Sequence, residues 1–517
     1  MSLVSSMNIA QQALSVNQAA ITVISNNISN VDTEGYSKLR INQSAIVNST
    51  PSAGNATSQA EACSGVKISS VTRYADPYLQ SYYRQENSTY SYLNEYSNVA
   101  SNIQDLTNEL NGTGLADALT NFYTSVDQLN SDPSDLTARE NYVQQAQNVA
   151  SVFNSTSTNL SYIQKSLVGD FNTAGSLESS QIAGSITDVN SLLTQIADVN
   201  TGIIKTNSAN SSSSSLLDQR DSLLKKLSEL LPADVTENSN GTVSISLGDV
   251  DLLKGSSVMG EFSVESVNAT PPVTVNFTQN NGNKIDVTKK IDSGSIGAIL
   301  DVCGNDSSKL TVSGVLKNLD AMAVSFATTL NDIQNGDPNG DGTVALAMDK
   351  TTKKLIESNP AIDLLVSNDA NALNASNISV NSTIANDPYL VSAARLNKVA
   401  YEASPTTYEN QTGNSTNVTL ILNSRTKTDS ALGDLSLEGY LSSTVSGIGS
   451  KVSDIETGLK NQTLVLKEVK SNLQSATGVN LDEELVDLVK YQRAYQAAAR
   501  VFSVCNDLMG ELVNLGK

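Results

Sequence analysis

A short acidic stretch is the residue pattern in this chain that comes closest to a metal site. Residues 337–342 read Asp-Pro-Asn-Gly-Asp-Gly, which matches the first half of a calcium-binding EF-hand loop. Asp337, Asn339 and Asp341 would supply the side-chain oxygens that Ca²⁺ prefers. The twelfth loop position, which needs a bidentate carboxylate, is Met348. An acidic turn therefore explains the segment better, and calcium binding is kept as the weaker alternative.

The sequence has few residues that could support other catalytic or ligand-binding chemistry. The chain has no histidine, which excludes Ser-His and Cys-His catalysis and imidazole metal ligands. Cys63, Cys303 and Cys505 are far apart and form no Cys-x-x-Cys pair, which argues against a disulfide framework or a zinc site. The adjacent carboxylates Glu483 and Glu484 are better explained by the preference for acidic residues at a helix start. We expect no enzyme activity and no cofactor.

The net charge and the hydropathy of the chain limit the kinds of partner that it can bind. The chain carries 53 acidic and 32 basic residues, a net charge of −21, which repels nucleic acid and anionic membranes. No apolar run reaches the roughly 18 residues of a membrane-spanning helix. The N-terminus lacks the basic and apolar regions of a cleaved secretory signal. We therefore expect no nucleic-acid partner, no membrane insertion and no cleaved leader.

The N-terminal stretch predicts one long helix with a narrow apolar face. Residues that step alternately by four and three form a seam suited to helix–helix packing: Leu3, Met7, Ala10, Leu14, Asn17, Ile21, Ile24, Ile28 and Val31. Asn17, its one polar member, either is a chance polar contact or fixes the register between helices. Gly35 falls where a helix-ending glycine is expected.

The C-terminal stretch repeats this spacing. Its seam, polar only at Gln492 and Asn506, comprises Leu481, Leu485, Leu488, Gln492, Tyr495, Ala499, Phe502, Asn506, Met509 and Val513. A narrow seam is too little to fold alone, so each terminal helix needs a partner. We expect the two to pair as a coiled coil.

The spacing of apolar residues between the two terminal helices predicts a multidomain α + β protein. Its elongated chain runs out and back, with the paired terminal helices, a long helical bundle and an inserted antiparallel β domain. The alternating residues 243–247 and 273–277 predict strands. We expect the middle of the sequence to lie farthest from the termini. The expected domains are 1–40 with 478–517 (terminal helices), 41–232 with 312–336 and 431–477 (bundle), 233–311 (β), and 337–430 (mixed, either a second insert or loops).

Several motifs carry a family resemblance. Residues 24–37, Ile-Ser-Asn-Asn-Ile-Ser-Asn-Val-Asp-Thr-Glu-Gly-Tyr-Ser, resemble the N-terminal signature of bacterial flagellar rod, hook and hook-associated proteins. Residues 478–485, Gly-Val-Asn-Leu-Asp-Glu-Glu-Leu, and the Tyr-Gln-Arg-Ala-Tyr run at 491–495 resemble their C-terminal helix. Ser37, the Leu-Leu-Asp-Gln-Arg-Asp segment at 216–221 and the chain length most resemble the hook-associated protein 1 family.

The resemblance implies a structural axial component of the bacterial flagellum that forms the junction between hook and filament. Such a protein is exported by the flagellar type III apparatus to the cell exterior without a cleaved signal peptide. The implied partners are further copies of itself in a ring or short helical layer, the hook protein, a second junction protein or flagellin, and an export chaperone on the C-terminal helix. A hook- or rod-type subunit and a surface adhesin exported by the same apparatus remain as alternatives.

The expected assembly residues lie on the two seams and in the N-terminal signature. They are Leu3, Met7, Leu14, Asn17, Ile21, Ile24, Ile28, Asn26, Asn27, Gly35, Tyr36, Leu481, Leu485, Leu488, Tyr495, Phe502 and Met509.

Overall fold

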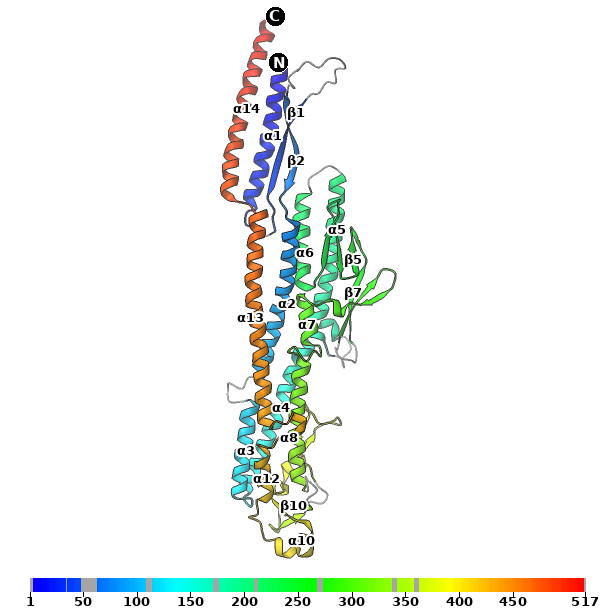
Figure 1. The fold of residues 1–517 in the computed structure, drawn as a ribbon, viewed down its shortest axis with the longest axis vertical. Coiled ribbons are helices and arrows are strands. Elements are labelled where there is room, and N and C mark those ends of the chain that lie inside the picture. The colour runs from blue at the N-terminus through cyan, green and yellow to red at the C-terminus, as the bar shows by residue number, and fades with distance from the viewer. Residues whose placement is uncertain are drawn as a thin grey trace.

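Both ends of the chain lie at the same end of a long, narrow molecule (Figure 1). The computed structural model describes residues 3–33, 35–47, 63–107, 114–170, 176–208, 213–266, 273–336, 342–357 and 362–515. Most of these residues are helical, and the strands form small antiparallel sheets. The expected out-and-back course is visible: the blue N-terminal and red C-terminal elements run side by side.

Four elements make up the terminal end: α1 (Leu3–Ser29), β1 (Leu39–Val47), β2 (Cys63–Arg73) and α14 (Leu481–Leu515). Figure 1 shows α14 antiparallel to α1, with the β1–β2 hairpin on the other side of α1. The expectation that α1 reaches Val31 is wrong, because Val31 lies exposed in a turn after Ser29. The amide of Asn30 bonds back to the Asn26 carbonyl, and Gly35 takes a φ of +83° that favours glycine.

Long helices form the shaft. They are α2 (Pro77–Thr107), α3 (Leu115–Ser131), α4 (Leu136–Val168), α5 (Gln181–Ser208), α6 (Ser214–Leu230), α7 (Gly294–Val302), α8 (Val312–Asn335) and α13 (Leu437–Thr477). Asp135 begins α4 by accepting hydrogen bonds from the backbone N–H groups of Thr137 and Ala138. One contiguous core joins these helices, and among the described residues α1 and α14 contribute nothing to it.

Two small antiparallel sheets lie beside α5. The first has the order β3 (Asp234–Glu237), β4 (Val243–Leu247), β5 (Val250–Lys254), β6 (Ser257–Val258); the second is β7 (Gly260–Ser266), β8 (Val273–Gln279), β9 (Lys284–Asp286). The strands expected at 243–247 and 273–277 are confirmed as β4 and part of β8. Asn190 and Asn200 of α5 dock the sheets, since each hydrogen bonds both the N–H and the C=O of one strand residue, Phe262 and Val243 respectively.

The far end contains β10 (Thr343–Met348), β11 (Leu355–Glu357), β12 (Leu365–Ser367), β13 (Ile378–Val380), β14 (Ala394–Asn397), α9 (Ser382–Asn386), α10 (Lys398–Ala403), α11 (Pro405–Tyr408) and α12 (Thr416–Ser424). The expectation that the middle of the sequence lies farthest from the termini is therefore wrong. Figure 1 shows that α4 and α5 bring the chain back toward the termini before β3–β9 form, so these strands lie partway along the shaft.

Candidate assembly site

The terminal helices pack against each other, as expected. α14 makes its main tertiary contact with α1, and α1 also contacts both strands of the hairpin. The buried residues of α1 are Ala10, Val16, Ala20, Ile24 and Asn27. Small side chains such as Ala10 and Ala20 let the helices approach closely. The chain itself therefore supplies a partner for the N-terminal seam.

The face of α14 that meets α1 differs from the one expected. Leu481, Leu485 and Tyr495 are exposed, whereas Glu484 and Cys505 are buried. The residues of α14 that α1 covers recur every seven positions, at Glu484, Tyr491, Ala498 and Cys505. Each member of this covered row comes one position before a member of the row that starts at Leu485. Of the other expected C-terminal residues, Leu488, Phe502 and Met509 are half-buried at the edge between the rows. α14 thus carries apolar side chains, such as Leu481 and Leu485, on a face that α1 does not cover.

Asn27 is the polar centre of this packing. Its side chain is 0% exposed, and its Nδ2 donates hydrogen bonds to the Leu39 carbonyl (2.9 Å) and to Glu484 Oε2 (3.0 Å). Its Oδ1 accepts from the Tyr36 hydroxyl (2.9 Å) and the Leu39 backbone N–H (3.1 Å). Both amide hydrogens and both carbonyl lone pairs are used, which offsets the cost of burying the group. One residue thereby ties the end of α1, the start of β1 and the start of α14.

Tyr36 keeps its proton under ordinary conditions. Burial, followed by the nearby carboxylates of Asp218 and Glu484, raises the pKa of Tyr36 to about 12. The neutral hydroxyl can therefore donate to Asn27 Oδ1 well above neutral pH. Glu484 is only 6% exposed, so the helix-dipole interpretation of this residue is incomplete. Its spacing of seven from Tyr491 was the available sequence signal for its inward position.

A cluster of ion pairs connects the hairpin to the shaft. Arg73, at the end of β2, donates to Asp218 Oδ1 and Asp221 Oδ2, both at 2.8 Å. Asp221 also accepts from Gln80 at 2.9 Å and from the Arg220 guanidinium. Burial raises the pKa of Asp218 although Arg73 opposes that effect. The 216–221 segment thus fixes the terminal end on α6, a role that the sequence motif alone did not reveal.

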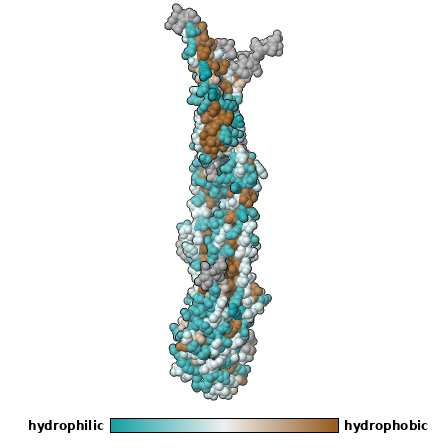
Figure 2. Space-filling model, turned by 90° about the vertical axis from the view of Figure 1, so that its left-hand side faces the viewer, coloured by the Kyte–Doolittle hydropathy of each residue, from teal (hydrophilic) through white to brown (hydrophobic). Residues whose placement is uncertain are grey.

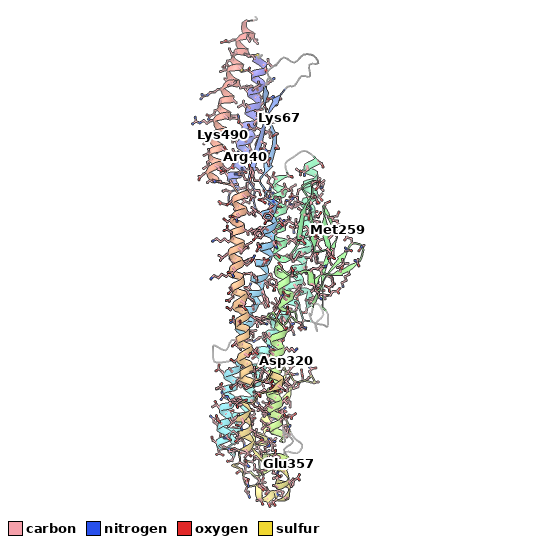
Figure 3. All side chains as sticks on the ribbon, in the orientation of Figure 1. Arg40, Lys67, Met259, Asp320, Glu357 and Lys490 are labelled. Carbon is pink, nitrogen blue, oxygen red and sulfur yellow. The ribbon has the colours of Figure 1, made fainter. Side chains whose placement is uncertain are left out.

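The outer face of α14 carries two apolar patches. The first patch comprises Leu481, Leu485, Val486 and Val489, and the second comprises Val501, Val504, Leu508 and Leu512; all eight are between 43% and 69% exposed. Figure 2 shows brown surface in two separate areas over this helix. Figure 3 shows Lys490 on α14 and Lys67 on the hairpin, on opposite sides of α1. Exposed apolar patches of this kind are characteristic of an interaction surface.

The remaining expected residues lie near these features. Leu3, Met7, Leu14, Asn17, Ile21 and Ile28 are half-buried on α1, whereas Asn26 and Gly35 are exposed. The seventeen expected assembly residues, apart from the exposed Asn26 and Gly35, therefore divide between the α1–α14 contact, the Asn27 centre and the open face of α14.

Nothing in the described parts of the chain resembles a metal or membrane site. The candidate calcium ligands Asp337, Asn339 and Asp341 lie outside the described residues. Within the described ranges, no three His, Cys, Asp or Glu residues gather as metal ligands would. No described helix has the length and hydropathy to cross a bilayer.

Known flagellar proteins match this chain over nearly its whole length. Three family models match: the flagellar hook-associated protein FlgK helical domain (residues 100–348), the flagellar basal body rod FlgEFG protein C-terminal region (470–515) and the flagella basal body rod protein (7–36). Flagellar hook-associated protein 1 of Bacillus subtilis is 25% identical, with 98% of this chain and 97% of that protein covered. The Escherichia coli protein of the same name is 26% identical, with 98% and 99% covered.

A solved structure shares the fold. The flagellar hook junction protein FlgK from Burkholderia pseudomallei matches with a TM-score of 0.56 at 17% identity, covering 76% of this chain and all of that one. The rod-protein models cover α1 and α14, the elements of the assembly site, and the hook-associated model covers much of the shaft. From this agreement of sequence and fold, the chain belongs to the hook-associated protein 1 (FlgK) family, whose members are axial components of the bacterial flagellum.

Proposed function

We propose that this protein forms the junction between hook and filament by packing its terminal helices against neighbouring subunits. The observation that carries the proposal is the uncovered apolar face of α14, which includes Leu485 and Val489. A helix with apolar side chains on its inner face and apolar patches on its outer face needs two partners, and α1 supplies one. Neighbouring subunits in the flagellar axis supply the other.

The hydrophobic core of the shaft does not extend into the terminal helices, and this separation supports the same role. The contiguous core of the shaft includes residues from Tyr96 to Val452 in the sequence and takes no described residue from α1 or α14. We therefore keep residues 1–40 with 478–517 as a separate terminal domain. This domain buries few side chains, so it has little stability of its own. Contact with neighbouring subunits adds to its stability.

The proposed partners are further copies of the chain, the hook protein, and a second junction protein or flagellin. An export chaperone that covers the open face of α14 before assembly fits the same surface, since an exposed apolar helix face promotes aggregation. Export without a cleaved leader, by the flagellar apparatus, completes the proposal.

The test is a variant that changes only the outer face of α14. Leu485, Val489, Val504 and Leu508 are each replaced by Ser in the full chain, and the variant replaces the native protein in the cell. We expect a soluble, folded protein and hooks without filaments, counted by electron microscopy. Serine at Val324, which is 41% exposed on α8, is the matched control and should leave filament numbers unchanged. Normal filament numbers with the four-residue variant would refute the proposal.

A further inference from the structure

The two apolar patches of α14 lie on different sides of the terminal helix pair. Because the covered row recurs every seven positions, residues seven apart share one direction relative to α1. Residues one or four positions after a covered residue turn to one side, and residues one before or three after it turn to the other. Leu481 and Leu485 of the first patch lie on the one side. Val501, Val504 and Leu508 of the second patch lie on the other.

The β1–β2 hairpin tells the two sides apart. Glu483 and Asp487 line a groove together with Ile41 of β1. Steps of seven residues lead from these two carboxylates to Val504 and Val501 respectively. The second patch therefore lies on the side of the helix pair that faces the hairpin, here named the hairpin side. The opposite side, with Leu481 and Leu485, is named the open side.

The open side carries two half-exposed apolar rows that run along both helices, here named the valley. The α1 row lies one position after the row of Asn27, which bonds to β1, so it turns away from the hairpin. Its members are Met7, Leu14, Ile21 and Ile28. The α14 row is Leu481, Leu488, Tyr495, Phe502 and Met509. α1 has no charged residue, and neither this α14 row nor the row of Leu485 beside it has one. The valley is therefore apolar and neutral.

The hairpin side of α14 carries an apolar ridge without charge. Between residues 494 and 508, its two rows consist of Ala494, Ala497, Val501, Val504 and Leu508. The last three side chains are 51%, 56% and 44% exposed. Small and branched apolar side chains can enter a valley between two helices, and no charge loses its water there.

Other exposed helix surfaces of the terminal domain fit the valley less well. The first turns of the hairpin side carry Glu483 and Asp487, which would be buried there without a counter-charge. The exposed side of α1 is uncharged, but apart from Val4 it consists of Asn, Gln, Ser and Thr, which gain little from burial against apolar side chains. The ridge is thus the better match in both polarity and charge.

We propose that the valley of one copy receives the ridge of α14, residues 494–508, from a second copy of this chain. This rests on the proposed function and names the surfaces by which copies pack. Ridge and valley lie on opposite sides of one helix pair, so a chain cannot join its own. Each copy offers its ridge to one neighbour and its valley to another, and such heterologous contacts form a ring or a helical layer.

The first experiment locates the ridge directly. The photoreactive residue benzoylphenylalanine replaces Val504 in the full chain, which is then assembled into flagella in cells and irradiated. The expected product joins two copies, with the cross-link between position 504 and a residue of the valley. The same residue at Tyr162, 72% exposed on α4, is the control and should not reach the valley. Cross-links from 504 to the hook protein, to flagellin, to the hairpin or to the shaft would overturn the inference, and so would links confined to one chain.

The second experiment adds a charge without changing the shape of the side chain. Gln492 is exposed on the open side, in the row of Leu485. Gln492→Glu should lower incorporation into flagella at least about tenfold, because the ridge of the neighbour offers the carboxylate no counter-charge.

The matched control is the same change at Gln496, which is also exposed but points away from α1 and from both sides of the pair. Gln496→Glu should leave incorporation within about twofold of the native level. Both variants should unfold at the native temperature as isolated subunits, since both glutamines are exposed there. Equal incorporation of the two variants would contradict the inference.

Failure of this inference is distinguishable from failure of the proposed function. If the two glutamate variants incorporate equally while serine at Leu485, Val489, Val504 and Leu508 still prevents filaments, the contact between valley and ridge is wrong and the proposed function stands. If filaments form normally with that four-residue variant, the proposed function fails, and this inference fails with it.

Discussion

Asn27 and Glu484, 457 residues apart in the chain, are joined by a buried hydrogen bond of 3.0 Å. Asn27 lies in the last turns of α1 and Glu484 in the first turn of α14. The bond therefore joins the two ends of the chain segment that forms the shaft. A buried carboxylate that loses its hydrogen-bond donor lowers the stability of the folded state. Substitutions in this pair should therefore destabilise the terminal domain.

Replacing Asn27 by Ala should loosen the terminal helix pair without unfolding the shaft. The change removes four hydrogen bonds and leaves Glu484 Oε2 without this donor, which costs about 2–3 kcal/mol of local stability. Limited proteolysis should show faster cleavage in α14 and an unchanged shaft fragment. Asn26→Ala, at the exposed neighbouring position, is the matched control. Equal cleavage of both variants would show that the Asn27 bonds contribute little.

The terminal pair should also loosen at alkaline pH. The pKa of Tyr36 is raised from 10.0 to about 12, so the folded state favours the neutral phenol. This contribution to stability is complete below pH 10 and is lost as the pH rises through about 12. Cleavage of α14 by a protease active at high pH should therefore increase between pH 10 and pH 12. The increase should be smaller in Tyr36→Phe, which has no proton to lose; an identical increase in both proteins would exclude Tyr36 as the cause.

The ion-pair cluster at the base of the hairpin should matter to the shaft. Arg73→Met leaves Asp218 and Asp221, whose side chains are 17% and 12% exposed, without their shared cation. We expect a loss of about 3 kcal/mol in the free energy of unfolding at pH 7, measured by thermal or urea unfolding. Arg40→Met removes an exposed guanidinium from the same hairpin and should cost less than about 0.5 kcal/mol. Equal losses in the two variants would contradict the assigned role of Arg73.

Much of the helical framework follows from the sequence because its signals are periodic. The bounds of α3, α5 and α8 agree with apolar spacings of three and four, and β4 alternates buried and half-buried residues as expected. The position of the strands along the shaft could not be predicted in this way. It depends on the turn between α3 and α4, after which α4 and α5 carry the chain back toward the termini, and periodicity carries no information on direction.

The assembly site was predictable only in part. The signature of α1 pointed to Asn27 and Tyr36, which the structure brings together with Glu484. The sequence predicts the wrong facing row of α14 because large apolar side chains such as Leu481 and Leu485 lie outside the row that α1 covers, whereas the covered row includes Glu484. Alanines such as Ala494 and Ala498 pack closely against a helix but add little hydropathy. Asn17 is half-buried, so its part in setting the register stays a prediction.

The two faces of the helix pair should respond differently to substitution in the isolated subunit. Ile24→Ala removes a buried side chain, 6% exposed, and should cost about 2–4 kcal/mol of local stability in the terminal pair. Val486→Ser, at a side chain that is 69% exposed, should cost less than about 0.5 kcal/mol. Protection of α14 from proteolysis measures both effects. Comparable losses would mean that the outer face of α14 is covered within the single chain.

Amide hydrogen exchange of α14 tests the central claim most directly, since the account holds that neighbouring subunits supply the cover that α14 lacks. Exchange is measured on the isolated full-length subunit and on assembled flagella, with α4 as an internal reference. We predict that α14 exchanges at least about tenfold more slowly after assembly, while the buried part of α4 is protected in both states. Equal protection of α14 in the two states would contradict the account, because the helix would then be stabilised by its own chain alone.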